Sequence, residues 1–346
     1  MTPGLVSTIV LNWNGKDIIF PCLNSLCKQT YPYHEIILVD NASTDGSVEL
    51  IEKEYGHVVT IVRNPKNLGF AEGVNTGIRN SRGEFIALLN SDATVKNNWL
   101  EQLVRKMQSS ESLGMCACKV YLADREGILD NTGELFCRDG LNRTRGRLEP
   151  DTGQYDTSED VLCPSGCAAL YRRKMLEDVG FFDKHFFAYG DDMDIGLRGR
   201  MLGYQAAYVS SAIAHHQLSA SSGLVSPLKA YYVERNRLWI AIRCFPLYHL
   251  LLSPFYTGLR YFFHLKGIFT KKGPASEFSK KSSPFRLLWI LFKVYAVTLF
   301  YLPYLLRERF KIQKCSLWKK KEFEACFKNY GISPREAALN EVLSEK

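Results

Sequence analysis

The sequence predicts an α/β fold with a mainly parallel sheet, followed by a mainly helical C-terminal extension. Strand-like apolar runs alternate with helical patterns over the first hundred residues, and polar residues follow the ends of several runs. The last third of the chain instead combines basic residues with bulky apolar ones. With 346 residues, 46% of them hydrophobic, the chain is long enough for one large domain with an appendage, or for two domains.

The order of elements favours βαβ units. We expect strands at residues 6–11, 35–39, 58–62 and 84–89, and helices at residues 21–29, 43–55, 70–80 and 97–109. Ser43 or Thr44 would cap the second helix. Strands separated by helices of this length indicate a parallel sheet, whose ligands bind in a crevice at the carboxyl ends of the strands.

Polar side chains stand just after three of these strands. They are Asn12, Asn14, Asp40, Asn90, Ser91 and Asp92. Each alone has a structural explanation, because Asx residues commonly form turns and caps. Their recurrence at the same end of three strands predicts one crevice that collects them.

The stretch NLGFAEGVNTGI places glycines at positions 69, 73 and 77, on one face of a predicted helix. Close packing of this helix on the sheet explains the spacing, since a helical glycine costs about 1 kcal/mol. The stretch is neither GxGxxG nor GxxxxGK[ST]. A dinucleotide site and a P-loop are therefore not indicated.

A second acidic set lies in FFAYGDDMDIGLRGRMLGY. We expect Asp191, Asp192 and Asp194 in the first turn of a helix, where the helix dipole favours carboxylates by about 0.3–1 kcal/mol. Asp194 can also pair with Arg198 four residues later. These structural roles explain one or two of the three acids, and an ionised general base beside a cleft would have the same pattern.

Two histidines, His215 and His216, follow a predicted strand at residues 205–210. A structural role and a ligand role both stay open for them. The ten cysteines show no pairs at zinc-ligand spacing. Because the strand-like residues 6–11 begin so early, we expect no secretory signal, and we interpret the cysteines as reduced thiols of a cytosolic protein.

Charge divides the chain. Residues 1–225 hold 22 Lys and Arg against 28 Asp and Glu, a net −6, whereas residues 226–346 hold 22 against 8, a net +14. The basic part includes FPLYHLLLSPFYTGLRYFFHL and FRLLWILFKVYAVTLFYLPYLL. This mixture fits a membrane surface and argues against nucleic acid as a partner.

Residues 287–306 are long enough to cross a bilayer. Lys293 would cost about 2.5–3.5 kcal/mol at its centre, and we expect Pro246, Pro254 and Pro303 to interrupt the apolar runs. Helices that lie in the membrane interface are therefore favoured over a spanning hairpin, while an ordinary helical subdomain stays open.

Four stretches together resemble the inverting glycosyltransferases of family 2, which have the GT-A, Rossmann-like nucleotide-sugar-binding fold. They are STIVLNWNGKDIIFPCLNSLCKQTYPYHEIILVDNASTDGS, NLGFAEGVNTGI, GEFIALLNSDATV and GFFDKHFFAYGDDMDIGLRGRMLGY, and they span about residues 5–240. Within the family the chain is similar to rhamnosyltransferase-like enzymes of surface-polysaccharide assembly, which also show YYVERNRLW and a basic tail like LPYLLRERFKIQ. The resemblance implies a catalytic domain at residues 1–225 and a membrane-associating region at residues 226–346.

The resemblance also implies a metal site and a base. Asp92 matches the last acid of the DxD motif and, with His216, would hold Mg²⁺ or Mn²⁺ on the donor diphosphate; we expect the Asp92 carboxylate in an open crevice. Asn90 stands in place of the motif's first acid, and its amide oxygen still suits a hard cation. Asp192 matches the catalytic base of a Glu-Asp pair, and Asp191 replaces the glutamate, which orients the acceptor, with a side chain one methylene shorter.

Donor-binding roles follow from the same resemblance. Asp40 would contact the nucleobase or ribose, and Asn12 and Asn14 would shape that pocket. The remaining donor-binding positions are Asn67, Gly69, Phe70, Asn75, Asn90 and Ser91.

The implied activity is inverting transfer of a hexose- or rhamnose-type sugar from a nucleotide-diphosphate sugar to a lipid-linked glycan, in cell-envelope polysaccharide synthesis. The enzyme would be cytoplasmic and peripheral on the inner face of the membrane. Two alternatives stay open. A nucleotidyltransferase would be expected to carry a glycine- and arginine-rich loop where this chain has NWNGKDII. A non-catalytic sugar- or lipid-binding relative would need no base, and Asp92, Asp192 and His216 argue against it.

Overall fold

The computed structural model describes residues 1–217 and 226–339. The chain divides into two compact units, the first from residues 1–134 and 144–221, and the second from residues 135–143 and 222–346. The predicted boundary after residue 225 lies near this division. Residues 135–143, however, belong with the second unit although they lie within the predicted first region.

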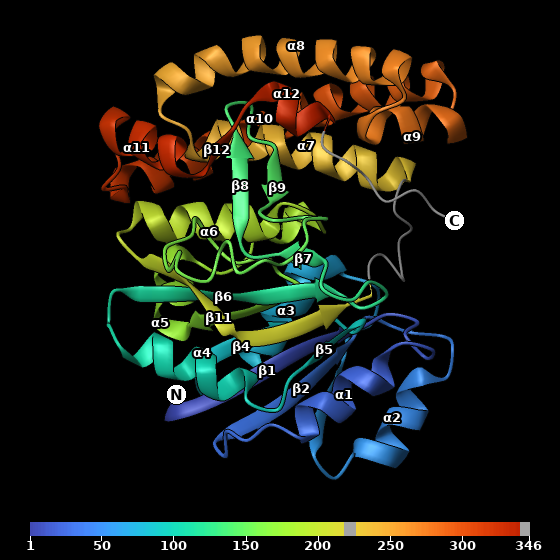
Figure 1. The fold of residues 1–346 in the computed structure, drawn as a ribbon, viewed down its shortest axis with the longest axis vertical. Coiled ribbons are helices and arrows are strands. Elements are labelled where there is room, and N and C mark those ends of the chain that lie inside the picture. Colours follow the sequence, from blue (N-terminus) through green and yellow to red (C-terminus); the bar gives the residue numbers. More distant parts are fainter. Residues whose placement is uncertain (218–225, 340–346) are drawn as a thin grey trace. The chain divides into compact units, whose positions relative to one another are not determined.

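A mixed nine-stranded sheet forms the first unit (Figure 1), in the order β3-β2-β1-β4-β10-β6-β11-β5, with β7 paired to β6. Strands β1 to β4 run parallel, as predicted, and β10 is antiparallel to both of its neighbours. The bounds are β1 (Thr2–Asn12), β2 (His34–Asp40), β3 (Val59–Arg63), β4 (Gly83–Leu89), β5 (Ala93–Val95), β6 (Leu113–Leu122), β7 (Leu129–Asn131), β10 (Ala168–Arg172) and β11 (Gln205–His216).

The helices of the first unit connect these strands. They are α1 (Ile19–Cys27), α2 (Ser47–Tyr55), α3 (Gly69–Arg79), α4 (Trp99–Gln108), α5 (Arg173–Val179), η1 (Lys184–Phe186) and α6 (Asp191–Met201). The four predicted helices of the first hundred residues are confirmed, with one local error. Helix α2 begins after Gly46, whose φ is +78°, without a side-chain cap. Ser43 and Thr44 lie in the loop before it, where they bond to other loop residues.

Helix α3 packs closely on the sheet through its glycines, as expected from their spacing. A Cβ at Gly77 would lie 2.5 Å from Ile9 Cγ2, and one at Gly73 would lie 3.0 Å from a Leu11 methyl group. Both contacts are with β1, so larger side chains would push the helix off the sheet.

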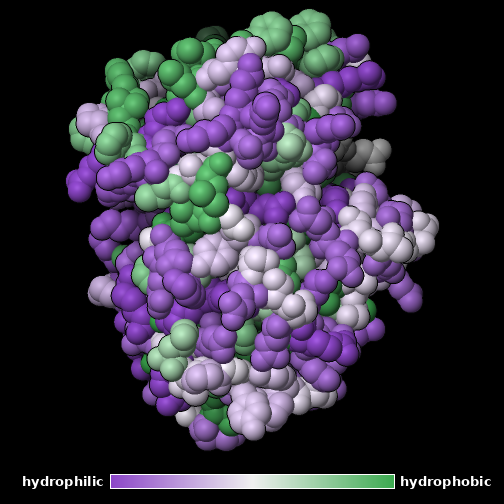
Figure 2. Space-filling model, turned by 90° about the vertical axis from the view of Figure 1, so that its left-hand side faces the viewer, coloured by the Kyte–Doolittle hydropathy of each residue, from purple (hydrophilic) through white to green (hydrophobic). Residues whose placement is uncertain are grey.

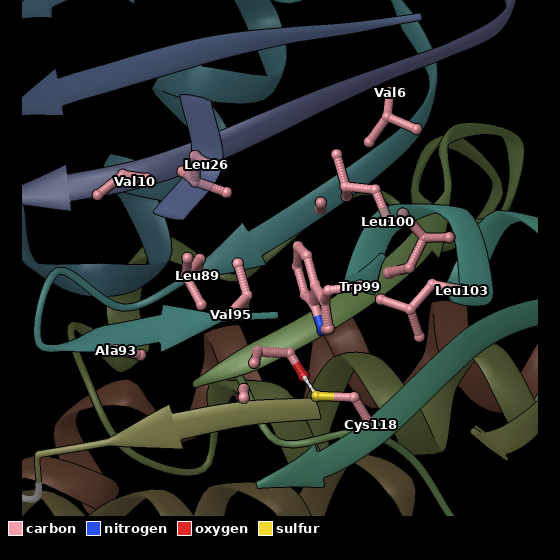
Figure 3. Close-up of a cluster of buried hydrophobic side chains, with 14 of the residues drawn as sticks. Val6, Val10, Leu26, Leu89, Ala93, Val95, Trp99, Leu100, Leu103 and Cys118 are labelled. Atoms are coloured by element: carbon pink, nitrogen blue, oxygen red, sulfur yellow. Dashed lines mark hydrogen bonds between the residues drawn. The ribbon is translucent and has the colours of Figure 1, made fainter. Parts of the chain in front are cut away.

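A cluster of buried apolar side chains packs on the face of the sheet opposite α3 (Figure 3). Trp99, Leu100 and Leu103 of α4 are fully buried there beside Leu89 and Val95. Burying such side chains contributes about 1.5–3 kcal/mol each. The packing fixes the ends of β4 and β5, and with them the polar loop at residues 90–92.

The second unit is helical, with a small three-stranded sheet in the order β12-β8-β9. Its elements are β8 (Glu134–Cys137), β9 (Asn142–Thr144), α7 (Pro227–Cys244), α8 (Leu247–Thr270), α9 (Gly273–Lys281), α10 (Pro284–Cys315), α11 (Lys320–Tyr330), β12 (Gly331–Ile332) and α12 (Pro334–Leu339). Pro246 separates α7 from α8, as predicted. The expectation that Pro254 and Pro303 interrupt the apolar runs is wrong, because both lie exposed inside continuous helices.

Helix α10 is long and apolar enough to cross a membrane, judged by length and composition alone. Its segment Phe285–Cys315 has a mean hydropathy of 1.6 over the most apolar 18 residues, and it is the one such segment among the residues that the structure describes. Only 17% of that window is buried within the protein.

Candidate active site

Three side chains, from β7, from β11 and from the turn between β4 and β5, form a chain of contacts at one edge of the sheet. His216 Nε2 lies 3.2 Å from Asp92 Oδ1, and His216 Nδ1 lies 2.9 Å from Asp130 Oδ2. Arg147 donates to the other oxygen of Asp130 at 2.7 Å. The imidazole is therefore held between two carboxylates.

Strand β11 delivers His216 to this place. The expectation that the two histidines follow a strand ending at residue 210 is wrong, since β11 continues through His216 after an irregularity between Val209 and Ile213. In the extended register His216 pairs with Ala93 of β5, directly after Asp92. His215 points elsewhere, and its ring stacks on Tyr121 at 5.7 Å between centroids, which is a structural role.

The three-residue contact chain is mostly buried. The side chains of Asp92 and His216 are 9% and 10% exposed, so the expectation that Asp92 sits in an open crevice is wrong. Burial disfavours the imidazolium, but the contacts with Asp130 and Asp92 help to raise the pKa of His216 well above its usual value. Burial likewise opposes ionisation of Asp130, whereas His216 and Arg147 lower the pKa of that carboxyl.

Sequence reasoning missed two members of this cluster, Asp130 and Cys167. Ligand atoms of Asp130, Cys167 and His216 lie within 4.8 Å of one another. Asp130 comes from β7, a strand of only three residues, and no periodicity marks it. Because burial raises the pKa of the Cys167 thiol, the sulfur stays protonated and is a poor ligand.

The remaining donors suit a divalent cation. Asp92 supplies carboxylate oxygens, and His216 supplies an imidazole nitrogen once a cation displaces its Nε2 proton. Asp130 lies behind the imidazole as carboxylates do behind metal-ligating histidines. Carboxylates suit Mg²⁺ and Mn²⁺, and an imidazole is accepted more readily by the softer Mn²⁺. The side chains present therefore fit a metal site.

A short loop joins this cluster to Asp192. The Gly166 N–H donates to Asp192 Oδ2 at 3.1 Å, and the carbonyl of the next residue, Cys167, accepts from the Asn90 N–H at 2.8 Å. A Cβ at Gly166 would lie 3.1 Å from the Phe70 ring, so the loop passes closely between Phe70 and Asp192. Asn90, Phe70 and Asp192, predicted from distant stretches of sequence, are thus brought together.

The three acids of α6 have different surroundings. Asp192 accepts a second hydrogen bond from the Met193 N–H at 2.8 Å; burial raises its pKa and the backbone donors lower it, with a net rise. Asp191 is 5% exposed, and burial followed by the Asp192 charge raises its pKa well above the usual value. Asp194 is paired with Arg198 at 2.8 Å, which agrees with the structural role expected for it.

The residues predicted to bind the nucleobase or ribose form a hydrogen-bonded loop at the ends of β1 and β2. Asn12 Nδ2 donates to Asp40 Oδ1 at 2.9 Å and to Ser47 Oγ at 2.9 Å. Asp40 also accepts from the Ser43 N–H and hydroxyl, at 3.1 and 2.6 Å. Asn14, with a φ of +52°, accepts from the Thr44 N–H at 2.8 Å. These side chains fix the loop that follows β2, and their contact with a nucleotide stays a prediction.

The remaining predicted donor residues fasten α3 and the loop after β4. Asn67 Oδ1 accepts from the Gly69 N–H at 2.8 Å, and a Cβ at Gly69, whose φ is +78°, would lie 2.4 Å from the Phe187 carbonyl. Asn75 is buried and exchanges two hydrogen bonds with the Phe182 backbone, at 2.7 and 3.1 Å. Ser91 is half-buried beside Asn90 and Asp92. Asn75 thus has a structural use of its amide.

Comparison with known proteins identifies relatives over this unit. Residues 7–180 match the model of Glycosyl transferase family 2. The chain is 26% identical over 269 residues to the O-antigen biosynthesis protein RfbC of Myxococcus xanthus, covering 74% of this chain and 21% of that protein. It is 28% identical over 221 residues to the putative glycosyltransferase EpsH of Bacillus subtilis, covering 63% and 62%. The chain thus spans less than two thirds of either relative.

Solved structures of several glycosyltransferases share this fold. A mannosyltransferase, PcManGT of Pyrobaculum calidifontis, in complex with GDP-Man and Mn²⁺, aligns with a TM-score of 0.52 and 18% identity over 91% of this chain and 87% of that chain. GalNAc-T7 with UDP, GalNAc and Mn²⁺ aligns with a TM-score of 0.56 and 15% identity over 69% and 48%. At these identities the likeness shows the fold alone, which is the GT-A fold.

Proposed function

The chain belongs to glycosyl transferase family 2, and on this premise we propose that it transfers a hexose- or rhamnose-type sugar, with inversion, from a nucleotide-diphosphate sugar to a hydroxyl group. One observation carries the proposal. The loop at residues 165–167 contacts both Asp192, through Gly166 N–H, and the Asp92–His216 cluster, through Cys167 and Asn90. A base and a set of metal ligands thus share one scaffold.

Asp92 and His216 would hold Mg²⁺ or Mn²⁺, with Asp130 orienting the imidazole. Such an ion, when bound, supplies a Lewis acid that neutralises the negative charge developing on the departing diphosphate. Asn12, Asp40 and the loop after β2 would bind the nucleoside. The GDP-Man and UDP complexes of structural neighbours that contain Mn²⁺ support this assignment.

Asp192 is the general base in this proposal. It takes the proton from the acceptor hydroxyl while the oxygen attacks the anomeric carbon on the face opposite the leaving group, so one displacement inverts that carbon. Two backbone N–H groups bind its carboxylate oxygens, which stabilises the ionised form that a base requires. Asp191, directly beside it, would orient the acceptor.

For the acceptor we propose a lipid-linked glycan of a cell-envelope polysaccharide, reached at the cytosolic face of a membrane. The names of two relatives support this class: the O-antigen biosynthesis protein of Myxococcus xanthus, and the poly-β-1,6-N-acetyl-D-glucosamine synthase of Staphylococcus epidermidis, which is 21% identical over 209 residues and covers 60% of this chain and 48% of that protein. The net +14 charge of residues 226–346 agrees with a partner that carries negative charge.

A donor screen tests the proposal. Calorimetry with UDP-, GDP- and dTDP-sugars, in Mn²⁺, in Mg²⁺ and in a chelator, should identify one donor whose affinity depends on the metal. Slow hydrolysis of that donor by the wild type, lost in Asp192→Asn but kept in the exposed control Asp124→Asn, would support catalysis. A chain that binds no nucleotide sugar under any of these conditions contradicts the proposal, and binding without hydrolysis or transfer indicates a non-catalytic relative.

A further inference from the structure

Helix α8 has its polar residues inside the second unit and its apolar residues outside. The buried positions include Ser253, Thr257 and Arg260, at 1–8% exposure. The outward positions are spaced by three, four or seven residues, so they share one helix face, and they are 59–85% exposed: Leu251, Phe255, Phe262, Leu265 and Phe269. This distribution is the reverse of the one expected for a helix on a water-exposed surface.

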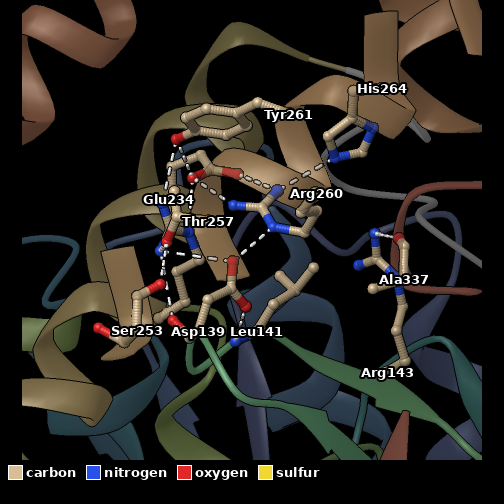
Figure 4. Close-up of polar contacts among 11 residues, drawn as sticks. Asp139, Leu141, Arg143, Glu234, Ser253, Thr257, Arg260, Tyr261, His264 and Ala337 are labelled. Atoms are coloured by element: carbon tan, nitrogen blue, oxygen red, sulfur yellow. Dashed lines mark hydrogen bonds and ion pairs between the residues drawn. The ribbon is translucent and has the colours of Figure 1, made fainter. Parts of the chain in front are cut away.

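A buried ionic network fixes this orientation (Figure 4). Arg260 Nε donates to Asp139 Oδ2 at 2.6 Å, and its terminal nitrogens donate to Glu234 at 2.8 and 3.0 Å. Arg237 of α7 donates to Glu234 at 2.6 Å and to the Thr257 hydroxyl at 3.3 Å. Rotating α8 to bury its phenylalanines would leave these charges without partners, which is costly, so the apolar face is held outward.

Helix α10 presents a second apolar face. Its inner residues Ile290, Val294, Thr298 and Leu305 are buried, and Thr298 accepts a hydrogen bond from Trp239 of α7 at 3.0 Å. The outer residues are 49–82% exposed: Phe285, Leu288, Trp289, Phe292, Leu299, Phe300, Leu306 and Phe310. At 1.5 Å per residue this stripe is about 38 Å long.

The start of α8, the end of α10 and the start of α11 line an open groove of about 510 Å³. The apolar lining of the groove comes from Leu247 at the start of α8 and from Leu306 and Phe310 near the end of α10. Its basic lining comes from Arg309, Lys319 and Lys320. Lys320 also lies over the Tyr248 ring, 4.1 Å from its centroid. Hydrophobic side chains gather along the upper margin of Figure 2, at the height of α8 and α10 in Figure 1.

We propose that the outward faces of α8 and α10 lie in the headgroup–acyl boundary of an anionic membrane, and that the groove between them takes a phospholipid phosphate. This deepens the proposed function and rests on it only for the identity of the acceptor. Charge favours lipid over a protein or a second copy: α8 holds no acidic residue, and α10 holds one, Glu308, already paired with Lys311. A basic helix with outward Trp, Phe and Leu is typical of interfacial membrane helices.

Vesicle binding by the full chain tests this inference without any sugar donor. The α8 variant Leu251→Gln/Phe255→Gln/Phe262→Gln and the α10 variant Phe292→Gln/Leu299→Gln/Phe300→Gln replace exposed side chains, so each should fold. Tyr33→Gln/Val58→Gln/Leu228→Gln is the matched control, because these residues are 49–68% exposed outside α8 and α10. We expect the wild type and control to sediment with phosphatidylglycerol vesicles, and each stripe variant to bind at least tenfold more weakly.

Two further measurements separate the parts of the surface. Lys319→Gln/Lys320→Gln should lose part of the preference for anionic over neutral vesicles, while retaining the binding that resists high salt. Trp289, 63% exposed, should show a blue-shifted emission on adding vesicles, and Trp289→Phe should reduce that shift.

Several outcomes would overturn the inference. Membrane binding would be contradicted if the wild-type protein stays soluble beside anionic vesicles at low salt. It would also be contradicted if the stripe variants bind vesicles as well as the control does. A lipid-free dimer that the stripe variants convert to a monomer would reassign the faces to a self-interface. Metal-dependent donor binding, measured on the same variants, should be unchanged, so a failure of the sugar-transfer proposal is distinguishable from a failure of this one.

Discussion

The Nδ1 atom of His216 lies 2.9 Å from Oδ2 of Asp130, a carboxylate that is itself 2% exposed. This contact directs the other ring nitrogen toward Asp92, 3.2 Å away. Removing a carboxylate behind a metal-ligating histidine typically costs 10–100-fold in metal affinity. We therefore expect Asp130→Asn to weaken Mn²⁺-dependent binding of the nucleoside diphosphate by about that factor, measured by calorimetry.

The exposed Asp124→Asn variant is the control for this change. If Asp130→Asn binds as tightly as the control at saturating and at limiting Mn²⁺, Asp130 is only a fold-stabilising partner of Arg147. A complete loss of metal binding would instead make Asp130 a direct ligand.

Asp92→Asn should separate charge from shape. The asparagine keeps an oxygen near His216 Nε2, so the fold should persist, but the ligand charge is lost. We expect the metal-dependent part of nucleoside-diphosphate affinity to disappear and the weaker metal-free part to remain. Calorimetry in Mn²⁺ and in a chelator measures both parts, and equal Mn²⁺ enhancement in variant and wild type would exclude Asp92 as a ligand.

Asp192→Asn should affect turnover and leave donor binding unchanged. General base catalysis is typically worth 10²–10⁴-fold in rate, and the donor site does not depend on a base. We expect the transfer rate, measured with the donor from the screen, to fall by roughly that factor at unchanged donor affinity. Near-normal turnover would assign the base to Asp191, its partner at the start of α6.

Sequence predicted the parts of the fold and the site that depend on local pattern. The parallel strands β1 to β4, and the polar residues at their ends, follow from alternating apolar runs. Asp130 and Cys167 could not be predicted as members of the site. Asp130 lies in β7, a strand of three residues, and Cys167 reaches His216 only through the antiparallel return of β10. No local pattern in the sequence indicates that return.

The ionic network of the second unit was also beyond prediction. Asp139 lies in a short hairpin about 95–120 residues before Glu234 and Arg260, and periodicity does not reveal pairs at that separation. The apolar runs of α8 and α10 were visible, but which face each helix exposes depends on these ion pairs. The sequence therefore indicated the membrane-like composition, and the contacts of Arg260 define the outward face.

Asp191 should limit stability at neutral pH. Burial and the neighbouring Asp192 charge raise its pKa above the unfolded-state value of 3.8, so its contribution is fully present below pH 3.8 and is lost as pH rises through the folded-state pKa. We expect Asp191→Asn, which cannot ionise, to raise Tm at pH 8, by roughly 2–4 °C for each kcal/mol regained.

The control is the same comparison of Tm between Asp191→Asn and wild type at pH 3.5. At that pH the wild-type Asp191 carboxyl is more protonated than at pH 8, in the folded and in the unfolded protein. The gain should shrink there. An equal gain at both pH values would mean that the asparagine stabilises by hydrogen bonding and not by removing charge.

Asp139 lies in the hairpin between β8 and β9, within the second unit. It is fully buried, accepts from Arg260 Nε at 2.6 Å and lies 3.7 Å from Arg237 Nη1. A Cβ at the next residue, Gly140, whose φ is +90°, would lie 2.2 Å from the Arg237 carbonyl, so the hairpin tip is pressed against α7. Burial opposes ionisation of Asp139, and the two arginines lower its pKa below the usual value.

Asp139→Ala should therefore destabilise the second unit strongly. Removing one partner of a buried pair typically costs about 3–5 kcal/mol, because the remaining charge stays buried and uncompensated. Glu308→Gln breaks the surface pair with Lys311, which is worth about 0–1 kcal/mol, and is the matched control. Hydrogen exchange of α7 and α8 measures the loss of protection in both variants.

The effect of Asp139 also depends on pH. Since the folded-state pKa of Asp139 is depressed, its contribution to stability holds above the unfolded-state pKa and is lost as pH falls through the folded-state value. The protection lost in Asp139→Ala should thus shrink in acid. Equal protection of α8 in Asp139→Ala and Glu308→Gln at neutral pH would mean that the ion pairs do not hold the helix with its apolar face outward.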